Sequence, residues 1–111
     1  MEIRIDQQSK AVVVVVKGRM DAVSAPAFER AMADHITTGG ASRFVVDCGA
    51  LEYVSSAGLR SLLTTAKTLR ARDGELVFAD LREVVREVFE IAGFGTIFAV
   101  FESTDAALEQ G

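Results

Sequence analysis

One short β-branched run, Ala11-Val-Val-Val-Val-Val16, restricts the fold of this chain more than any other feature. A run of this kind is typical of a central strand buried on both faces, because a strand with one wet face would show polar residues at every second position. Before it, Ile3 and Ile5 alternate with charged residues, which is the pattern of a half-buried edge strand. Residues 7–10 are the predicted turn that joins the two strands as a hairpin.

The rest of the chain alternates between helical patterns and short apolar runs. Further strands are predicted at 44–46, 76–79 and 96–101, and loops at 18–23 and 48–54. The first helix is predicted to begin at Ser24, with Pro26 in its first turn, and to bury a stripe at helical spacing. The second helix has apolar residues at i, i+3, i+4, i+7 and i+10, which are Leu59, Leu62, Leu63, Ala66 and Leu69. Either Ser55 or Ser56 would cap it.

Two more helices are predicted in the last third. Asp80-x-x-Glu83 resembles a capping box that opens a helix, and Gly93 and Gly95 close it. Its inward residues are predicted to be Leu81, Val84, Val85, Val88 and Phe89. A short terminal helix is predicted from Ser103 through Leu108.

The predicted element order is therefore ββαβαβαβα. Strands separated by single helices indicate an α/β fold with a mainly parallel sheet, an N-terminal hairpin and helices packed on the sheet. The 111 residues, half of them hydrophobic, suffice for one core. We expect a single domain over residues 1–111.

Several classes of function are excluded by what the chain lacks. One Cys and one His leave no disulfide framework, and we expect no metal site and no cofactor. The net charge of −4 argues against nucleic-acid partners. No apolar run is long enough to span a membrane, and the N-terminus lacks a signal layout, so we expect no membrane partner and a cytoplasmic location. Without paired acid–base groups or phosphate-binding glycine loops, an enzyme is not expected.

The stretch from Val45 to Leu63 carries the clearest potential for chemistry. It places Ser55 and Ser56 at the start of a helix, where unpaired N–H groups and the helix dipole stabilise an anion. A hydroxyl there accepts a phosphate without disrupting the helix. The alternative is structural: the serines cap the helix, and Ala57-Gly58 permits close packing.

This stretch resembles the phosphorylation motif of STAS domains in bacterial anti-sigma-factor antagonists. The matching parts are Asp47, Leu51, Tyr53, Val54, Ser55-Ser56, Gly58 and Leu59. Gly18-Arg-Met-Asp21 is similar to a family turn after the second strand. The segments 74–79 and 85–94 are similar to the family's last strand–helix–strand unit, so the resemblance covers the whole chain.

By position, the resemblance implies that Ser56 is the phospho-acceptor, with Ser55 as its rival. The chain departs from well-known members at Ser55, where Asp is frequent, and at Ala57, where Ser or Thr is frequent. Asp21, Asp47, Ser55, Ala57, Gly58 and Arg60 are the expected partner-binding residues. For Asp21, an Asx-type turn is an equally weighted alternative, and Asp47 is expected to end its strand near the acceptor.

The function implied is a regulatory switch. Unphosphorylated, the protein would bind an anti-sigma factor that is also a serine kinase and free the sigma factor. Phosphorylation of Ser56 would end that binding, and a metal-dependent Ser/Thr phosphatase would restore it. The second hypothesis is a ligand- or nucleotide-sensing STAS module that regulates another effector. Cys48 is interpreted as a small core residue, since no His lies near it in sequence.

Overall fold

The valine run forms the second strand of a five-stranded sheet in a computed structural model that describes residues 1–110. In chain order the elements are β1 (Glu2–Gln7), β2 (Val12–Met20), α1 (Ala25–Thr38), β3 (Arg43–Val54), α2 (Ser56–Arg70), β4 (Glu75–Ala79), α3 (Glu83–Ile91), the 3₁₀ turn η1 (Phe94–Thr96), β5 (Val100–Phe101) and α4 (Thr104–Glu109). The strands are ordered β1-β2-β3-β4-β5. Only β1 is antiparallel to its neighbour, which confirms the predicted hairpin and mainly parallel sheet.

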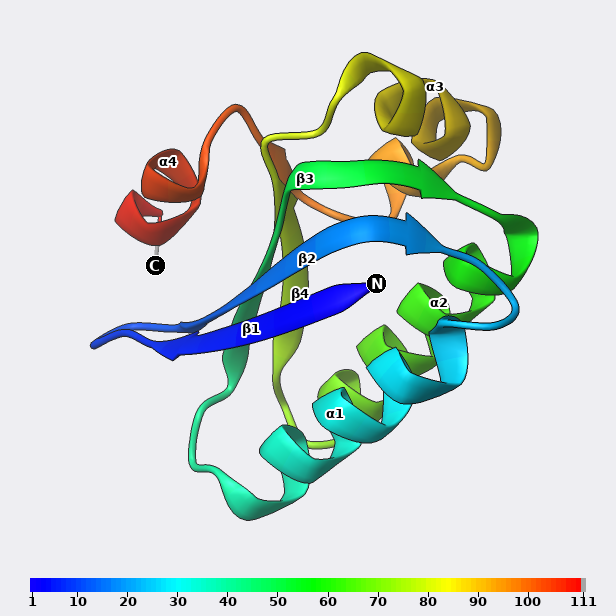
Figure 1. Cartoon of the computed structure of the whole chain (residues 1–111). Helices are drawn as coiled ribbons and strands as arrows, with labels where there is room; N and C mark the ends of the chain where they lie inside the picture. Colours follow the sequence, from blue (N-terminus) through cyan, green and yellow to red (C-terminus); the bar gives the residue numbers. More distant parts are fainter. Residues whose placement is uncertain (111) are drawn as a thin grey trace.

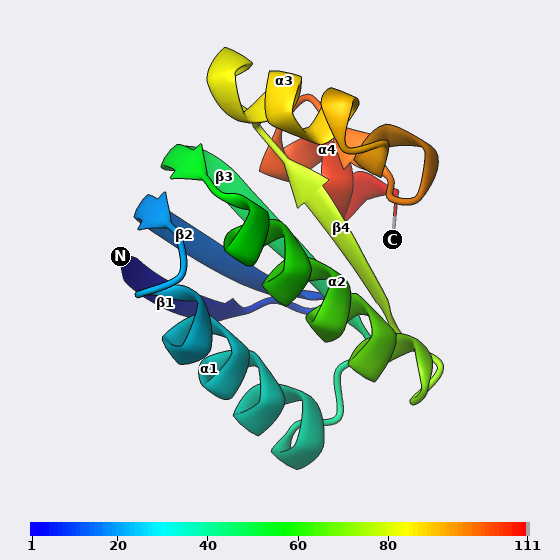
Figure 2. The same ribbon diagram turned by 90° about the vertical axis from the view of Figure 1, so that its right-hand side faces the viewer.

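Helices cover both faces of the sheet (Figures 1 and 2). Helices α1, α2 and α3 pack on one face, and the short α4 lies on the other. Along β2, Val12, Val14 and Val16 belong to the larger core beneath the three helices, and Val13 belongs to the smaller core beneath α4. Burial on both faces explains why this strand carries no polar alternation.

Helices α1 and α2 lie side by side, and their apolar stripes match the prediction. Phe28, Met32 and Ile36 of α1 are buried, as are Leu62, Ala66 and Leu69 of α2, while Leu59 and Leu63 are half-buried. No helix within residues 1–110 is long and apolar enough to cross a membrane.

The predicted loops at 18–23 and 48–54 are largely wrong. Strand β2 continues to Met20 and β3 to Val54, and the two strands stay paired to that end. The pairing shifts register between Val15 and Lys17 and again between Gly18 and Arg19. Such bulges break the period-two pattern by which a strand is recognised in sequence. Gly18, at φ +100°, supplies a conformation that other residues rarely adopt.

The capping box at Asp80-x-x-Glu83 is also wrong. Helix α3 begins at Glu83 after Arg82, and no side chain caps it. Asp80 adopts a left-handed conformation (φ +58°), and its N–H still donates to the carbonyl of Phe101 in the sheet. Leu81 is buried before the helix starts, whereas Val84 is half exposed because the nine-residue helix turns Val85 and Phe89 inward.

The strand predicted at 96–101 is reduced to Val100–Phe101. Residues 94–96 form a 3₁₀ turn after Gly93, which takes the left-handed conformation. Phe94 and Phe98 contact each other at 5.3 Å between ring centroids, and Phe98 meets Phe78 edge-on at 5.1 Å. Aromatic packing on the core thus accounts for the apolar residues that suggested a longer strand.

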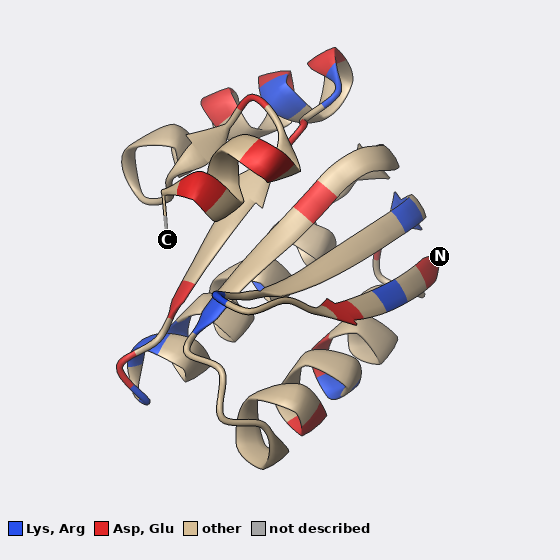
Figure 3. Cartoon of the chain, turned by 90° about the vertical axis from the view of Figure 1, so that its left-hand side faces the viewer, with Lys and Arg blue, Asp and Glu red and all other residues tan. Residues whose placement is uncertain are grey.

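Figure 3 shows the side of the sheet that carries α4. Arg43 ties this helix to the sheet: its side chain donates to the carbonyl of Ala107 at 2.8 Å and to Glu75 at 2.9 Å. Helix α4 buries Ala107 against Val45 and Val77, and it leaves β1 and part of β2 uncovered on that face.

Candidate functional site

The two serines of the motif lie at the junction between β3 and α2, and the structure gives them different roles. Ser55 is the only residue between the two elements. Its N–H donates to the carbonyl of Met20 at 2.9 Å, and its Oγ accepts from the N–H of Gly58 at 3.1 Å. Ser55 is therefore the N-cap of α2, is half-buried, and has its hydroxyl engaged.

Ser56 is the first residue of α2 and is exposed. Within residues 1–110 its hydroxyl makes no hydrogen bond to the protein, and the first turn of α2 carries no acidic residue. The unpaired N–H groups and dipole of a fifteen-residue helix make this position favourable for negative charge. Of the two serines, Ser56 is the one whose oxygen is free to react.

Gly58 has a structural role in the described molecule. It is buried, and a Cβ atom built on it would lie 2.7 Å from the carbonyl oxygen of Met20 and 2.8 Å from a methyl group of Val54. The absence of a side chain lets the start of α2 sit directly on the ends of β2 and β3. Contact between Gly58 and a partner stays a prediction.

Asp21 forms the Asx-type turn that the sequence allowed. Its Oδ1 accepts from the N–H of Val23 at 3.1 Å and from that of Ser24 at 3.2 Å. The hydrogen bond from Ser24, with smaller help from Val23 and Arg19, lowers the pKa of Asp21 below its ordinary value. The turn adjoins the α2 start, since the carbonyl of Met20 binds Ser55.

Asp47 does not end a strand, so that prediction is wrong. It lies within β3, paired with Val15 and Ala79, and its Oδ1 accepts from the N–H of Gly49 at 3.0 Å. It shares the α4 side of the sheet with Val45. Seven residues of strand separate it from Val54, roughly 20 Å. The structure therefore brings Asp21 to the Ser56 end of the sheet and leaves Asp47 away from it.

A stacked pair at this end was missed by sequence reasoning. The guanidinium of Arg19 lies 4.3 Å from the ring centroid of Tyr53, and its Nε is 4.0 Å from Asp21. Both residues sit at the last paired positions of β2 and β3. Tyr53 belonged to the motif, but Arg19 is recognisable only once the register of the parallel strands is known.

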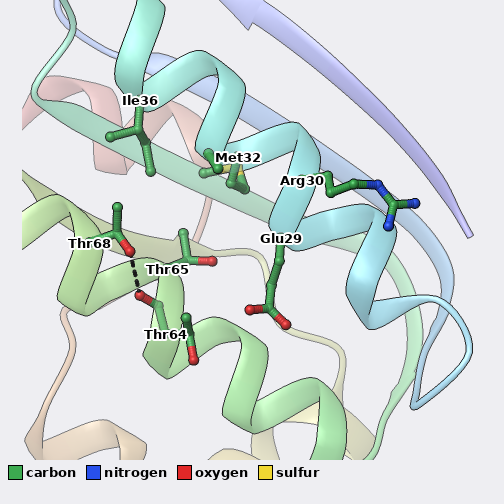
Figure 4. Close-up of a pocket in the computed structure, with 8 residues that line it drawn as sticks. Glu29, Arg30, Met32, Ile36, Thr64, Thr65 and Thr68 are labelled. Atoms are coloured by element: carbon green, nitrogen blue, oxygen red, sulfur yellow. Dashed lines mark hydrogen bonds between the residues drawn. The ribbon is translucent and has the colours of Figure 1, made fainter.

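A groove runs between α1 and α2 and opens beside the start of α2. Its section nearest Ser56 has a volume of about 340 Å³, and its lining includes Ala22, Ala57 and Arg60. The next section, of about 280 Å³, is lined by Met32, Ile36 and the threonines of α2 (Figure 4). Glu29 lines both sections and accepts a hydrogen bond from Ser61 at 2.7 Å.

Cys48 is a core residue, as its position after an apolar run suggested. Its side chain is buried, and this burial raises the pKa of its thiol far above the ordinary value. Across residues 1–110, the His, Cys, Asp and Glu side chains form no group of three that could hold a metal ion.

Comparison with known proteins agrees with the motif. The family model for the STAS domain matches residues 2–107. The chain belongs to the STAS family. It is 41% identical over 107 residues to the inferred anti-sigma factor antagonist BtrV of Bordetella bronchiseptica, covering 96% of this chain and 91% of BtrV. The anti-sigma-B factor antagonist of Staphylococcus aureus is 27% identical over 105 residues, with 95% and 96% covered.

The STAS fold of the chain is also that of SpoIIAA, an anti-sigma factor antagonist. The unphosphorylated form of SpoIIAA superimposes with a TM-score of 0.86 at 18% identity, covering 98% of this chain and 95% of SpoIIAA. The phosphorylated form of the Bacillus protein superimposes with a TM-score of 0.77 at 17% identity, with 98% of each chain covered. The domain is thus a member of the anti-sigma factor antagonist family.

Proposed function

We propose that this STAS domain is an anti-sigma-factor antagonist switched by phosphorylation of Ser56. Unphosphorylated, it binds an anti-sigma factor that is itself a serine kinase and so releases the sigma factor; phosphorylated, it does not bind. The observation that carries the proposal is the division of labour at the α2 start, where Ser55 is held in the cap while Ser56 is exposed and unengaged.

A phosphate on Ser56 would change the surface and leave the fold intact. It adds a charge of about −1.5 to −2 at the positive end of the α2 dipole, where an anion stabilises the helix. In a packed interface the same charge has to lose its hydration, and it repels acidic groups of a partner. A loss of about 3 kcal/mol in binding free energy would weaken the complex roughly a hundredfold.

The proposed partner surface surrounds Ser56. Asp21, Ala57 and Arg60 lie on it or line the groove that opens there, and Val23, 90% exposed, offers an apolar contact in the same loop as Asp21. Large exposed apolar side chains beside a functional group are typical of interaction sites. Ser55 and Gly58 contribute mainly by holding the helix start, and Asp47 would serve as a separate, more distant contact.

The domain itself would bind and be modified without catalysing a reaction. The anti-sigma factor would supply ATP and Mg²⁺ for the transfer, and a metal-dependent Ser/Thr phosphatase would return the phosphoserine to serine. All of these partners operate in the cytoplasm, which is where the proposal places the domain.

The test starts with phosphosite mapping. The purified domain is incubated with extract of its source cells, ATP and Mg²⁺, and wild type, Ser56→Ala and Ser55→Ala are compared by mass spectrometry. We expect phosphate on wild type and on Ser55→Ala, and none on Ser56→Ala. Phosphate that persists in Ser56→Ala, or none in wild type, would overturn the assignment of the acceptor.

Partner switching is tested separately with the kinase identified in that extract. Wild type and Ser56→Ala should bind it equally, whereas Ser56→Asp should bind at least tenfold more weakly by calorimetry. Equal affinity of all three proteins would refute the switch even if Ser56 is phosphorylated.

The groove beside Arg60 supports a second candidate, a ligand- or nucleotide-sensing STAS module. Its section of about 340 Å³ is within the range of small-ligand sites. Thermal-shift measurements with nucleoside mono-, di- and triphosphates test it. A saturable rise in melting temperature that Arg60→Gln abolishes would favour this candidate.

A further inference from the structure

Arg60 lies one helical turn after Ser56 on the same face of α2. Residues at i and i+4 of a helix have Cβ atoms about 5–6 Å apart, so their side chains meet at the surface. Both residues are exposed and both lie within the helix. Arg60 forms no ion pair with any group in residues 1–110, so its guanidinium is available.

We propose that Arg60 is the intramolecular partner of the Ser56 phosphate, an inference that rests on the proposed function. After phosphorylation the guanidinium folds back onto the phosphate oxygens, where a planar fork of donors matches their geometry. The order is the favourable one, with the acid N-terminal to the base at i, i+4. The modification then adds an anion and withdraws a cation from the same surface.

The other charged groups at this end are already engaged. Arg19 on β2 stacks on Tyr53 and lies 4.0 Å from Asp21. The carboxylate of Glu29 on α1, which lines the same groove as Arg60, accepts from Ser61. Arg60 is therefore the cation with the shortest route to the phosphate and with no competing partner in the described structure.

This pairing gives Arg60 a different role in each state of the switch. Before phosphorylation its charge is presented to the outside, where a carboxylate of the partner is the matching group. After phosphorylation the same charge is held by the phosphate. Replacing Arg60 should therefore weaken binding by the unphosphorylated protein and also alter the phosphate itself.

The test uses phosphoserine inserted at position 56 during synthesis by codon reassignment, which needs no kinase. The second ionisation of the phosphate is followed by ³¹P NMR in wild type, Arg60→Gln, Arg60→Lys, and the controls Lys67→Gln and Arg19→Gln. Lys67 is exposed on the same helix two turns further on. We expect Arg60→Gln to raise the pKa of the phosphate by about 0.3 unit, a twofold change in its proton dissociation constant.

Arg60→Lys should give an intermediate value, because the charge remains and the forked geometry is lost. Lys67→Gln and Arg19→Gln should leave the pKa unchanged, and 1 M salt should remove the difference between wild type and Arg60→Gln. An unchanged pKa in Arg60→Gln, or an equal shift in Arg19→Gln, would overturn the pairing. Neither outcome depends on whether a kinase modifies Ser56 in cells, so the proposed function is judged separately by phosphosite mapping.

Discussion

Helices α1 and α2 both begin after a serine at the ends of neighbouring parallel strands, yet only one of these helix starts leaves a hydroxyl free. At α1, the Oγ of Ser24 donates to the carbonyl of Arg19 and accepts from the N–H of Asp21, so it is consumed by the turn. At α2, Ser55 caps the helix and a second serine follows. The comparison teaches that a reactive serine at a helix start requires a neighbour that already satisfies the backbone.

The largest difference between the two starts lies in how closely each helix approaches the sheet. Gly58→Val should destabilise the domain by about 3 kcal/mol, because the new side chain meets the Met20 carbonyl and Val54 at less than contact distance. Chemical denaturation measures the change. Gly40→Ala is the matched control, since a Cβ there has no neighbour within 4 Å. Similar stabilities of the two variants would show that α2 does not need this close approach.

Removing the turn hydroxyl at α1 is expected to have the next largest effect. Ser24→Ala loses two hydrogen bonds, at 2.8 and 2.9 Å, and should cost about 1.5 kcal/mol of unfolding free energy. Because Ser24 does not cap α1 through its side chain, the loss should loosen the 19–24 turn more than the helix. Hydrogen exchange at the amides of Asp21 and Val23 distinguishes the two; faster exchange confined to α1 would contradict the assignment.

The two serines at α2 should separate clearly in stability. Ser55→Ala removes the cap and should cost about 1 kcal/mol. Ser56→Ala should change the unfolding free energy by less than about 0.5 kcal/mol, because its hydroxyl contacts nothing that the fold needs. Thermal unfolding of both variants side by side is sufficient. A loss at Ser56 equal to that at Ser55 would mean that the hydroxyls share the cap, and it would weaken the case for Ser56 as the free acceptor.

The smallest expected effect is the acid sensitivity of the α1 turn. The folded-state pKa of Asp21 is lowered, so near pH 4 the unfolded chain binds more protons at this residue than the folded one. Its contribution to stability is present above the unfolded pKa and disappears as pH falls through the folded value. The melting temperature of Asp21→Asn should therefore fall less steeply than that of wild type below about pH 4. Parallel curves for the two proteins would refute this contribution.

Local patterns predicted the elements that are stabilised by their own periodicity. The valine run, the apolar stripe of α1 and that of α2 each appear at the predicted positions, because burial on one or two faces leaves a direct trace in the spacing of residues. The elements that were wrong depend on distant partners. Strand β3 extends to Val54 only because it pairs with the bulged end of β2, and Asp80 stays in the sheet through Phe101.

The candidate site divides in the same way. The Ser55-Ser56 pair, the small residues after it and the Asx turn at Asp21 were all identifiable from the sequence. Which serine caps α2 was left open, since both have the right chemistry and adjacent positions. Arg19 stacked on Tyr53, and the distance of Asp47 from Ser56, required the register of β2 against β3.

The sequence by itself determined the α/β class, the order of strands and helices, and the presence of a modifiable serine at a helix start. These follow from hydrophobic periodicity and from the few residue types that suit a helix N-terminus. Only the tertiary structure decided that Ser55 is fixed and Ser56 is free. The physical reason is that the choice depends on the backbone of a different strand: the carbonyl of Met20 takes the N–H of Ser55 and so places Ser56 in the first turn, facing solvent.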